Sequence, residues 1–89
     1  MNTLLYSEVL RLAPEDNDRL FNLCGKLNEH LKLIETRLGV LIKQRGYTFS
    51  IMGERQAVEQ AALALYNLYD ETKKVNILES KEVIYIYKV

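Results

Sequence analysis

The spacing of hydrophobic residues changes several times along the chain, and each change marks a predicted element. Residues 4–12 (LLYSEVLRL) are rich in branched and aromatic residues and stop before Pro14, which cannot donate to a strand ladder. They predict a strand with Leu10 and Leu12 on its buried face. Residues 16–24 begin with acidic residues and end with an apolar cluster, which predicts a short helix. That cluster consists of Leu20, Phe21, Leu23 and Cys24.

The middle of the chain predicts a second helix followed by a β-hairpin. The apolar residues before Gly39 recur at helical spacing: Leu27, Leu31, Ile34 and Leu38. This stripe predicts a helix that starts at residue 27 or 28, ends at 38 and buries one face. Residues 40–45 and 47–52 are alternating or β-branched and are separated by Gly46, a pattern typical of two strands joined by a tight turn. One face of the second strand carries Tyr47, Phe49 and Ile51.

The last part of the chain contains the strongest helical pattern and an ambiguous tail. Residues 54–74 are rich in Ala, Leu, Glu and Gln, which favour helix. Their apolar stripe consists of Val58, Ala61, Ala62, Leu65, Leu68 and Tyr69. Further on, alternation from Val83 to Val89 is typical of a strand, whereas Ser80 could cap a short helix. The residues alone leave both possibilities open for the tail.

The predicted order of elements is strand, helix, helix, strand, strand, helix. This βααββα order predicts an α+β fold in which a three-stranded sheet has its helices packed on one face and its other face partly open. A chain of 89 residues suits one small domain. We expect a single domain over residues 1–89, with a core of about residues 4–74 and a C-terminal extension over 75–89.

The formal net charge is zero, but the charges are unevenly distributed. Segment 26–46 has five basic and two acidic residues, a net charge of +3 with His30 neutral. Its basic residues are Lys26, Lys32, Arg37, Lys43 and Arg45. Because nucleic-acid binders often carry an overall basic excess, any such binding here must depend on this local segment.

Few residues suggest catalysis. Cys24 is the only cysteine and His30 the only histidine, so neither an internal disulfide nor a zinc site can be assembled from them. We expect Cys24 in the core and His30 on the surface of the second helix. No nucleophile, base and orienting group come together, and we expect this chain to be no enzyme and to carry no cofactor or metal.

The beginning of the chain has neither the basic start nor the long apolar run of a secretory signal, and no stretch reaches the roughly 18 apolar residues of a membrane span. We therefore expect a cytoplasmic protein with no membrane partner. Most of the six tyrosines are typical of packing residues at the edge of the core. Alternatively, those near the C-terminus could form an exposed apolar patch of the kind that marks interfaces: Tyr66, Tyr69, Tyr85 and Tyr87.

The corner between the first two predicted helices has two interpretations. It reads Gly25, Lys26, Leu27, Asn28, and the following helix N-terminus offers unpaired N–H groups that suit a phosphate. Alternatively, Gly25 simply ends one helix, Asn28 caps the next and the basic side chains are solvated. The residue pattern alone favours this plainer interpretation.

The element order and this corner resemble the KH nucleic-acid-binding domain. In that family a Gly-x-x-Gly loop between the first two helices clamps the backbone of four nucleotides, and bases lie between the second helix and the next strand. The resemblance implies single-stranded RNA as the partner. It also implies a nucleic-acid-binding set of Gly25, Lys26, Leu27, Asn28, Lys32, Arg37, Val40, Ile42, Lys43 and Arg45, with Val40 and Ile42 as an apolar groove wall. This chain departs from the family at Asn28, where the second glycine would be.

Several blocks more specifically resemble the N-terminal KH-like domain of PhoH-like proteins, which are P-loop ATPases. They are LAPEDNDRLFNLCG, IETRLGV, RGYTFSIMG and the Ala-rich helix, within roughly residues 8–74. The resemblance implies an ATPase domain of the same protein as a partner and favours helix over residues 79–88. The chain itself contains no G-x-x-x-x-G-K-S/T motif, so we expect no ATP binding by it.

A second hypothesis is a protein-interaction module. The same fold could dock on the ATPase domain or on a ribosome-associated partner, or could form a homo-oligomer. The missing second glycine, the zero net charge and the tyrosine-rich end motivate this alternative.

Overall fold

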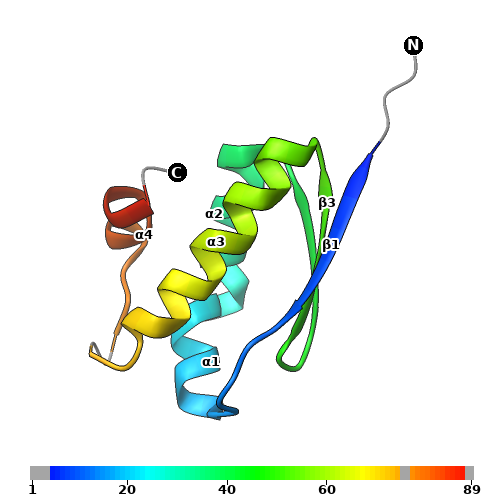
Figure 1. Ribbon diagram of the computed structural model, residues 1–89. Coiled ribbons are helices and arrows are strands. Elements are labelled where there is room, and N and C mark those ends of the chain that lie inside the picture. Colours follow the sequence, from blue (N-terminus) through cyan, green and yellow to red (C-terminus); the bar gives the residue numbers. More distant parts are fainter. Residues whose placement is uncertain (1–4, 75–76, 88–89) are drawn as a thin grey trace.

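The computed structural model of the chain describes residues 5–74 and 77–87 (Figure 1). In chain order its elements are β1 (Tyr6–Arg11), α1 (Asn17–Cys24), a 3₁₀ turn (Lys26–Asn28), α2 (Glu29–Leu38), β2 (Leu41–Arg45), β3 (Thr48–Gly53), α3 (Arg55–Glu71) and α4 (Ser80–Tyr87). The predicted α+β fold and βααββα order are confirmed, and α4 follows them.

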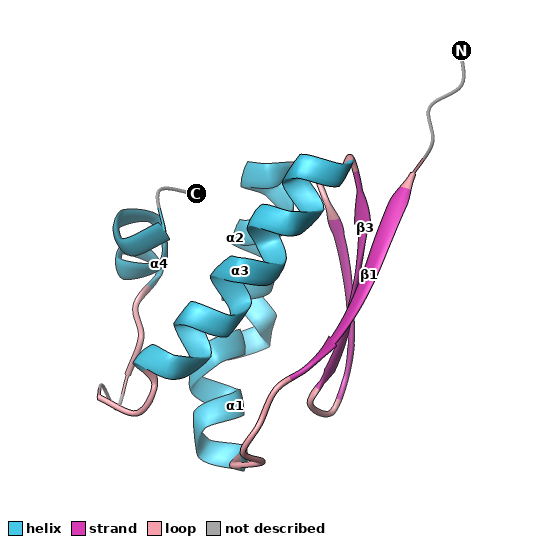
Figure 2. Cartoon of the chain, viewed as in Figure 1, coloured by secondary structure: helices cyan, strands magenta, loops and turns pink. Residues whose placement is uncertain are grey.

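The sheet is antiparallel, with strand order β1-β3-β2. Residue pairs Leu10–Phe49 and Ile42–Ile51 lie directly opposite each other across the strands and turn toward the helices. Figures 1 and 2 show α1, α2 and α3 on this side of the sheet. No element of the described chain covers the other side, as the sequence predicts.

Helix α3 crosses the sheet and contacts β1, β3, α1 and α2. Its whole predicted stripe is buried: Val58, Ala61, Ala62, Leu65, Leu68 and Tyr69. The small alanines allow the other elements to approach closely, while the branched residues fill the space above Phe49 and Ile51. The core is therefore organised around α3, the helix with the clearest pattern in the sequence.

Polar contacts join the start of α1 to the end of α3. The Asp16 carboxylate accepts hydrogen bonds from the amides of Asp18 and Arg19, capping α1. Arg19 donates to the Thr72 hydroxyl at 2.9 Å and the Tyr69 carbonyl at 2.8 Å, and its guanidinium lies over the Tyr69 ring. The Tyr69 hydroxyl donates to the Pro14 carbonyl. Tyr69 is thus buried, as its place in the apolar stripe of α3 predicts, and the alternative of an exposed tyrosine patch is wrong for this residue.

The rest of that predicted patch has a mixed outcome. Tyr66 is exposed, whereas the side chains of Tyr85 and Tyr87 lie outside the described residues. Residues 80–87 form a helix, so the strand interpretation of the tail is wrong for them. Val83 is fully buried and joins Leu78 in the core, because α4 packs against α2.

Helix α2 starts one or two residues later than predicted, which changes its buried face. Leu27 precedes the helix and is 88% exposed, so its place in the buried stripe is wrong. His30 is only 1% exposed, so its predicted surface position is wrong as well. Leu31 and Ile34 are buried as expected, and Leu38 is partly buried.

Candidate nucleic-acid interface

The corner between α1 and α2 has an unusual backbone. Gly25 has φ 80° and ψ 174°, a conformation found almost only in glycine. Leu27 (φ 52°, ψ 32°) and Asn28 (φ 58°, ψ 32°) are consecutive left-handed residues. Asn tolerates this region, but a leucine there costs roughly 1 to 2 kcal/mol. Such strain persists only where surrounding structure holds it, and it is common at functional sites.

His30 fills the space beneath Gly25. A Cβ atom on Gly25 would lie 2.8 Å from Glu29 Cγ and 2.9 Å from the His30 ring, so no side chain fits. His30 Nδ1 donates to the Leu23 carbonyl at 3.0 Å. His30 Nε2 is buried without a hydrogen-bond partner among the described residues, and the Glu29 carboxylate lies 3.9 Å from it. The corner is a close-packed unit rather than a loose connection.

The corner leaves the start of α2 without a side-chain cap. The Asn28 amide N–H bonds to the Gly25 carbonyl at 3.1 Å, and the Glu29 N–H bonds to the Lys26 carbonyl. The Asn28 side chain makes no capping bond to α2. Gly25 ends α1 and Asn28 occupies the N-cap position of α2, as the plainer interpretation predicts, but the cap has no side-chain hydrogen bond. The Asn28 side chain is exposed, and Glu29 places an acidic side chain in the first turn of α2, at the positive end of the helix dipole.

A groove of about 250 Å³ runs beside this corner. Its lining comes from α1, the corner and the edge strand β2: Asn17, Leu20, Phe21, Cys24, Gly25, Leu27, Asn28 and Gln44. Leu27 and the 64% exposed Phe21 provide apolar surface, whereas Asn28 and Gln44 carry amide groups. The groove thus combines an apolar wall with hydrogen-bonding groups, the combination that single-stranded bases require.

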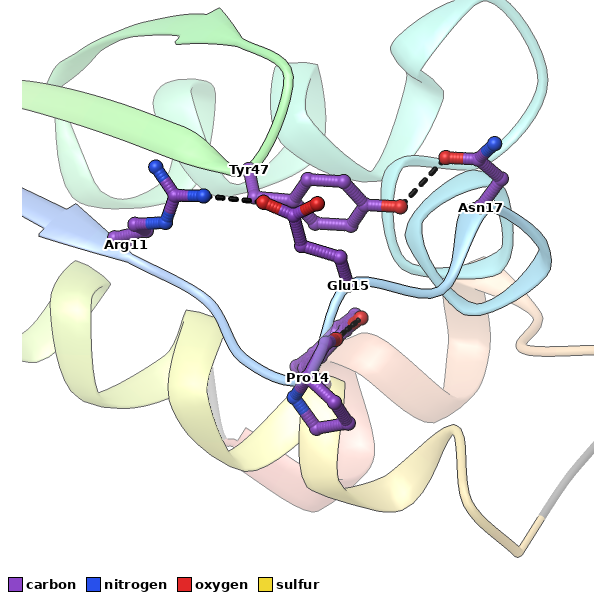
Figure 3. Close-up of polar contacts among 6 residues, drawn as sticks. Arg11, Pro14, Glu15, Asn17 and Tyr47 are labelled. Carbon is purple, nitrogen blue, oxygen red and sulfur yellow. Dashed lines mark hydrogen bonds and ion pairs between the residues drawn. The ribbon is translucent and has the colours of Figure 1, made fainter.

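Two hydrogen bonds position the groove walls. The Tyr47 hydroxyl donates to the Asn17 side chain, which ties the β2–β3 turn to the start of α1 (Figure 3). On α2, the Glu35 carboxylate accepts the Ile42 N–H at 2.7 Å. The N–H groups of successive residues in an antiparallel strand point to opposite edges. The Ile42 N–H therefore points to the outer edge of β2, the edge away from β3. Part of that edge is therefore occupied by Glu35 rather than free for a base.

Some predicted site residues meet at this groove. Gly25, Leu27 and Asn28 line it, and Lys32 is exposed near the start of α2. Ile42 faces the helices and packs partly against the core beside them. Lys26, although at the corner, lines a different hollow between α1 and residues 77–80.

Four predicted residues lie elsewhere. Val40 is buried in the core, so the predicted apolar wall is formed by α1 instead. Arg37 comes five residues after Lys32, which turns it about 140° away from that residue around α2. Lys43 and Arg45 are directly opposite Ser50 and Thr48, on the open face of the sheet. The basic segment is therefore divided between two surfaces.

Sequence reasoning missed the α1 wall. Phe21 was grouped with Leu20, Leu23 and Cys24 in one apolar cluster, and Asn17 and Gln44 were not assigned to a site. A signal was available, since Leu20, Leu23 and Cys24 have the i, i+3, i+4 spacing of one buried stripe and Phe21 lies at its edge. Cys24 was correctly placed in the core, and its burial raises the pKa of the thiol to about 11. It is therefore an unreactive thiol.

Three further findings concern chemistry and family. Among residues 5–74 and 77–87, no three His, Cys, Asp or Glu side chains gather as a metal site would require. None of the helices in the described part of the chain combines the length and hydrophobicity of a membrane span. A scan against models of known protein families found none that matches the chain.

Proposed function

We propose that this chain is an RNA-binding module of KH type, which holds single-stranded RNA in the groove between α1, the corner and β2. The observation that supports it is the position of the strained Gly25–Asn28 backbone, directly beside a groove with apolar and amide groups. In the KH arrangement a corner at this point of the chain clamps the nucleotide backbone.

In this proposal each wall has a separate role. Bases lie against Leu20 and the exposed ring of Phe21, because aromatic rings stack on bases of any sequence. The Gln44 amide can donate to and accept from base edges. Lys26, which lines the neighbouring hollow at the corner, and Lys32 on α2 attract phosphates, and neither has an ion pair within the described residues.

Asn28 can replace the second glycine of the KH clamp, although it carries a side chain. Its backbone is already left-handed, which is the conformation a glycine would adopt at little cost. The asparagine therefore preserves the shape of the corner. Its amide stands where a phosphate or base would approach and can hydrogen-bond to either.

The experiment is fluorescence anisotropy of labelled single-stranded RNA with the 89-residue chain. We expect dissociation constants in the micromolar to sub-millimolar range and affinity that falls with salt. The double variant Lys26→Ala/Lys32→Ala should reduce the slope of log K against log salt by about 1.4, since each phosphate contact on a single strand contributes about 0.7. Arg55→Ala/Lys74→Ala is the control, because it removes the same formal charge at residues that line neither the groove nor the hollow beside the corner. Absence of salt-dependent binding, or equal effects of the two variants, would reject the proposal.

We also propose, on the sequence resemblance alone, that the chain is the N-terminal domain of a PhoH-like ATPase and acts in the cytoplasm. The ATPase domain of the same protein would then be a partner. Sequencing the reading frame beyond residue 89 tests this, because a P-loop motif should follow.

A protein-interaction role remains the second candidate. A hollow of about 820 Å³ lies between α1, the corner and residues 77–80, and Phe21 and Ile77 expose apolar surface there. Sedimentation velocity tests this role. A monomer with no affinity for its ATPase domain would count against it.

A further inference from the structure

The open face of the sheet has a polar, basic end and an apolar end. Strand register places Arg11 and Arg45 on either side of Thr48, and Lys43 beside Ser50 in the next row. The other end of the face has exposed Leu41 and Met52 on neighbouring strands. These rows follow from the alternation of β2 and β3, whose opposite positions enter the core.

The basic end is not neutralised by acidic side chains on the same face. Lys43 and Arg45 form no ion pair within the described part of the chain. Arg11 pairs with Glu15, as Figure 3 shows, but both side chains are more than half exposed. An exposed pair of this kind contributes at most about 1 kcal/mol, so a phosphate can replace the carboxylate.

The spacing of these cations suits an extended polyanion. Residues two apart on a strand are separated by roughly 6.6 Å, and neighbouring strands by about 4.8 Å. The Cα atoms of Arg11 and Arg45 are thus roughly 10 Å apart, with the Thr48 hydroxyl between them as a further donor. Like charges this close repel one another, so an anionic ligand on this face is favoured.

The face is continuous with the groove around the edge of β2. Gln44 lines the groove, and the residues on either side of it, Lys43 and Arg45, point to the open face. No other strand of the described chain pairs with the outer edge of β2. A strand of RNA leaving the groove at Gln44 therefore meets these two cations first.

We propose that single-stranded RNA continues from the groove around the edge of β2 onto the open face, where Lys43, Arg45 and Arg11 bind its phosphates. This inference rests on the proposed function of the groove. RNA fits the face better than an acidic protein, because each nucleotide combines an anionic phosphate with an apolar base face. Those two chemistries match the basic and apolar ends of the sheet.

The test compares two RNA lengths. A tetranucleotide fills the groove alone, whereas a 12-nucleotide strand can also reach the open face. We expect Lys43→Gln/Arg45→Gln to weaken binding of the longer RNA by about 10-fold near 0.1 M salt and to lower its salt slope by about 1.4. Binding of the tetranucleotide should be unchanged. Arg11→Gln should act in the same direction but less, because Glu15 already offsets its charge.

The control and the groove variant separate the possible outcomes. Arg55→Gln/Lys74→Gln changes the net charge equally and should leave both RNAs unaffected, whereas Lys26→Ala/Lys32→Ala should weaken both. The open-face proposal is overturned if the 12-nucleotide RNA binds no more tightly than the tetranucleotide, or if the open-face and control variants behave alike. If neither RNA binds the unmodified chain, the groove proposal fails and this one fails with it. If the open-face variant alters only self-association in sedimentation, the face is a protein interface instead.

Discussion

Gly25 and Gly39 end the two consecutive helices α1 and α2, yet they occupy very different surroundings. Gly39 has the ordinary left-handed helix ending (φ 68°, ψ 37°), and a Cβ there would meet no atom within 4 Å. Gly25 is held against Glu29 and His30 and is followed by two left-handed residues. One glycine only stops a helix, whereas the other permits a packed and strained corner. A glycine at the end of a helix therefore does not by itself identify the structure that follows it.

The largest expected effect comes from filling the space at Gly25. Gly25→Ala adds backbone strain of about 1 to 3 kcal/mol. It also creates a clash with His30, which costs about another 1 to 3 kcal/mol, the range observed when a core is overpacked. Gly39→Ala adds only left-handed strain, about 1 kcal/mol. Urea unfolding monitored by circular dichroism measures both. Equal losses of stability in the two variants would remove the distinction between the corners.

The next effect tests the histidine beneath the corner. His30→Leu retains bulk but removes the donor to the Leu23 carbonyl, and an unsatisfied buried acceptor costs about 1 to 3 kcal/mol. We expect a loss near 2 kcal/mol in the same unfolding experiment. Lys32→Ala, at an exposed position two residues along, should change stability by less than about 0.5 kcal/mol. If His30→Leu is as stable as the unmodified chain, the prediction is contradicted. The cost of burying the unpartnered Nε2 would then equal the stabilisation from the Nδ1 hydrogen bond.

Alkaline pH provides a third test, through the residue before Gly25. Burial raises the pKa of Cys24 from 9.0 to about 11, so the folded chain keeps its proton where the unfolded chain loses it. The contribution of Cys24 to the free energy of unfolding is fully present below pH 9. It decreases by on the order of 2 kcal/mol as the pH rises to 11. The difference between the unmodified chain and Cys24→Ala isolates this contribution from tyrosines and lysines that titrate nearby. If the difference in free energy of unfolding between the unmodified chain and Cys24→Ala stays constant from pH 8 to 11, the prediction is contradicted.

The contrast between the corners also explains what the sequence could predict. Repeating patterns identified α2, α3 and the β-hairpin, because the α3 stripe and the β3 alternation each reflect burial of one face, whereas residue types and end signals identified β1 and α1. The corner has no repeat. Its left-handed Leu27 delays the start of α2, which exposes Leu27, buries His30 and changes which side chains reach the groove.

The basic side chains of residues 26–46 lie on two surfaces, and the sequence pattern did not predict this either. Residues 26–46 are basic as a stretch, but helix phase directs Arg37 away from the groove, and strand alternation sends Lys43 and Arg45 to the other face of the sheet. Their positions follow from the register and from the exact start of α2. Neither can be determined from charge alone.

The smallest expected change in stability, at Leu27, separates structural from functional strain. Leu27→Gly removes left-handed strain but makes the unfolded chain more flexible, so the two effects nearly cancel to within about 0.5 kcal/mol. If the exposed leucine contacts a base, the same variant loses apolar contact worth about 1 kcal/mol, which is roughly a fivefold loss of affinity for the tetranucleotide. Anisotropy and urea unfolding on the same sample measure both quantities. Unchanged affinity together with a stability gain well above 0.5 kcal/mol would mean that the strained leucine serves neither packing nor RNA, and the corner would lose its main functional argument.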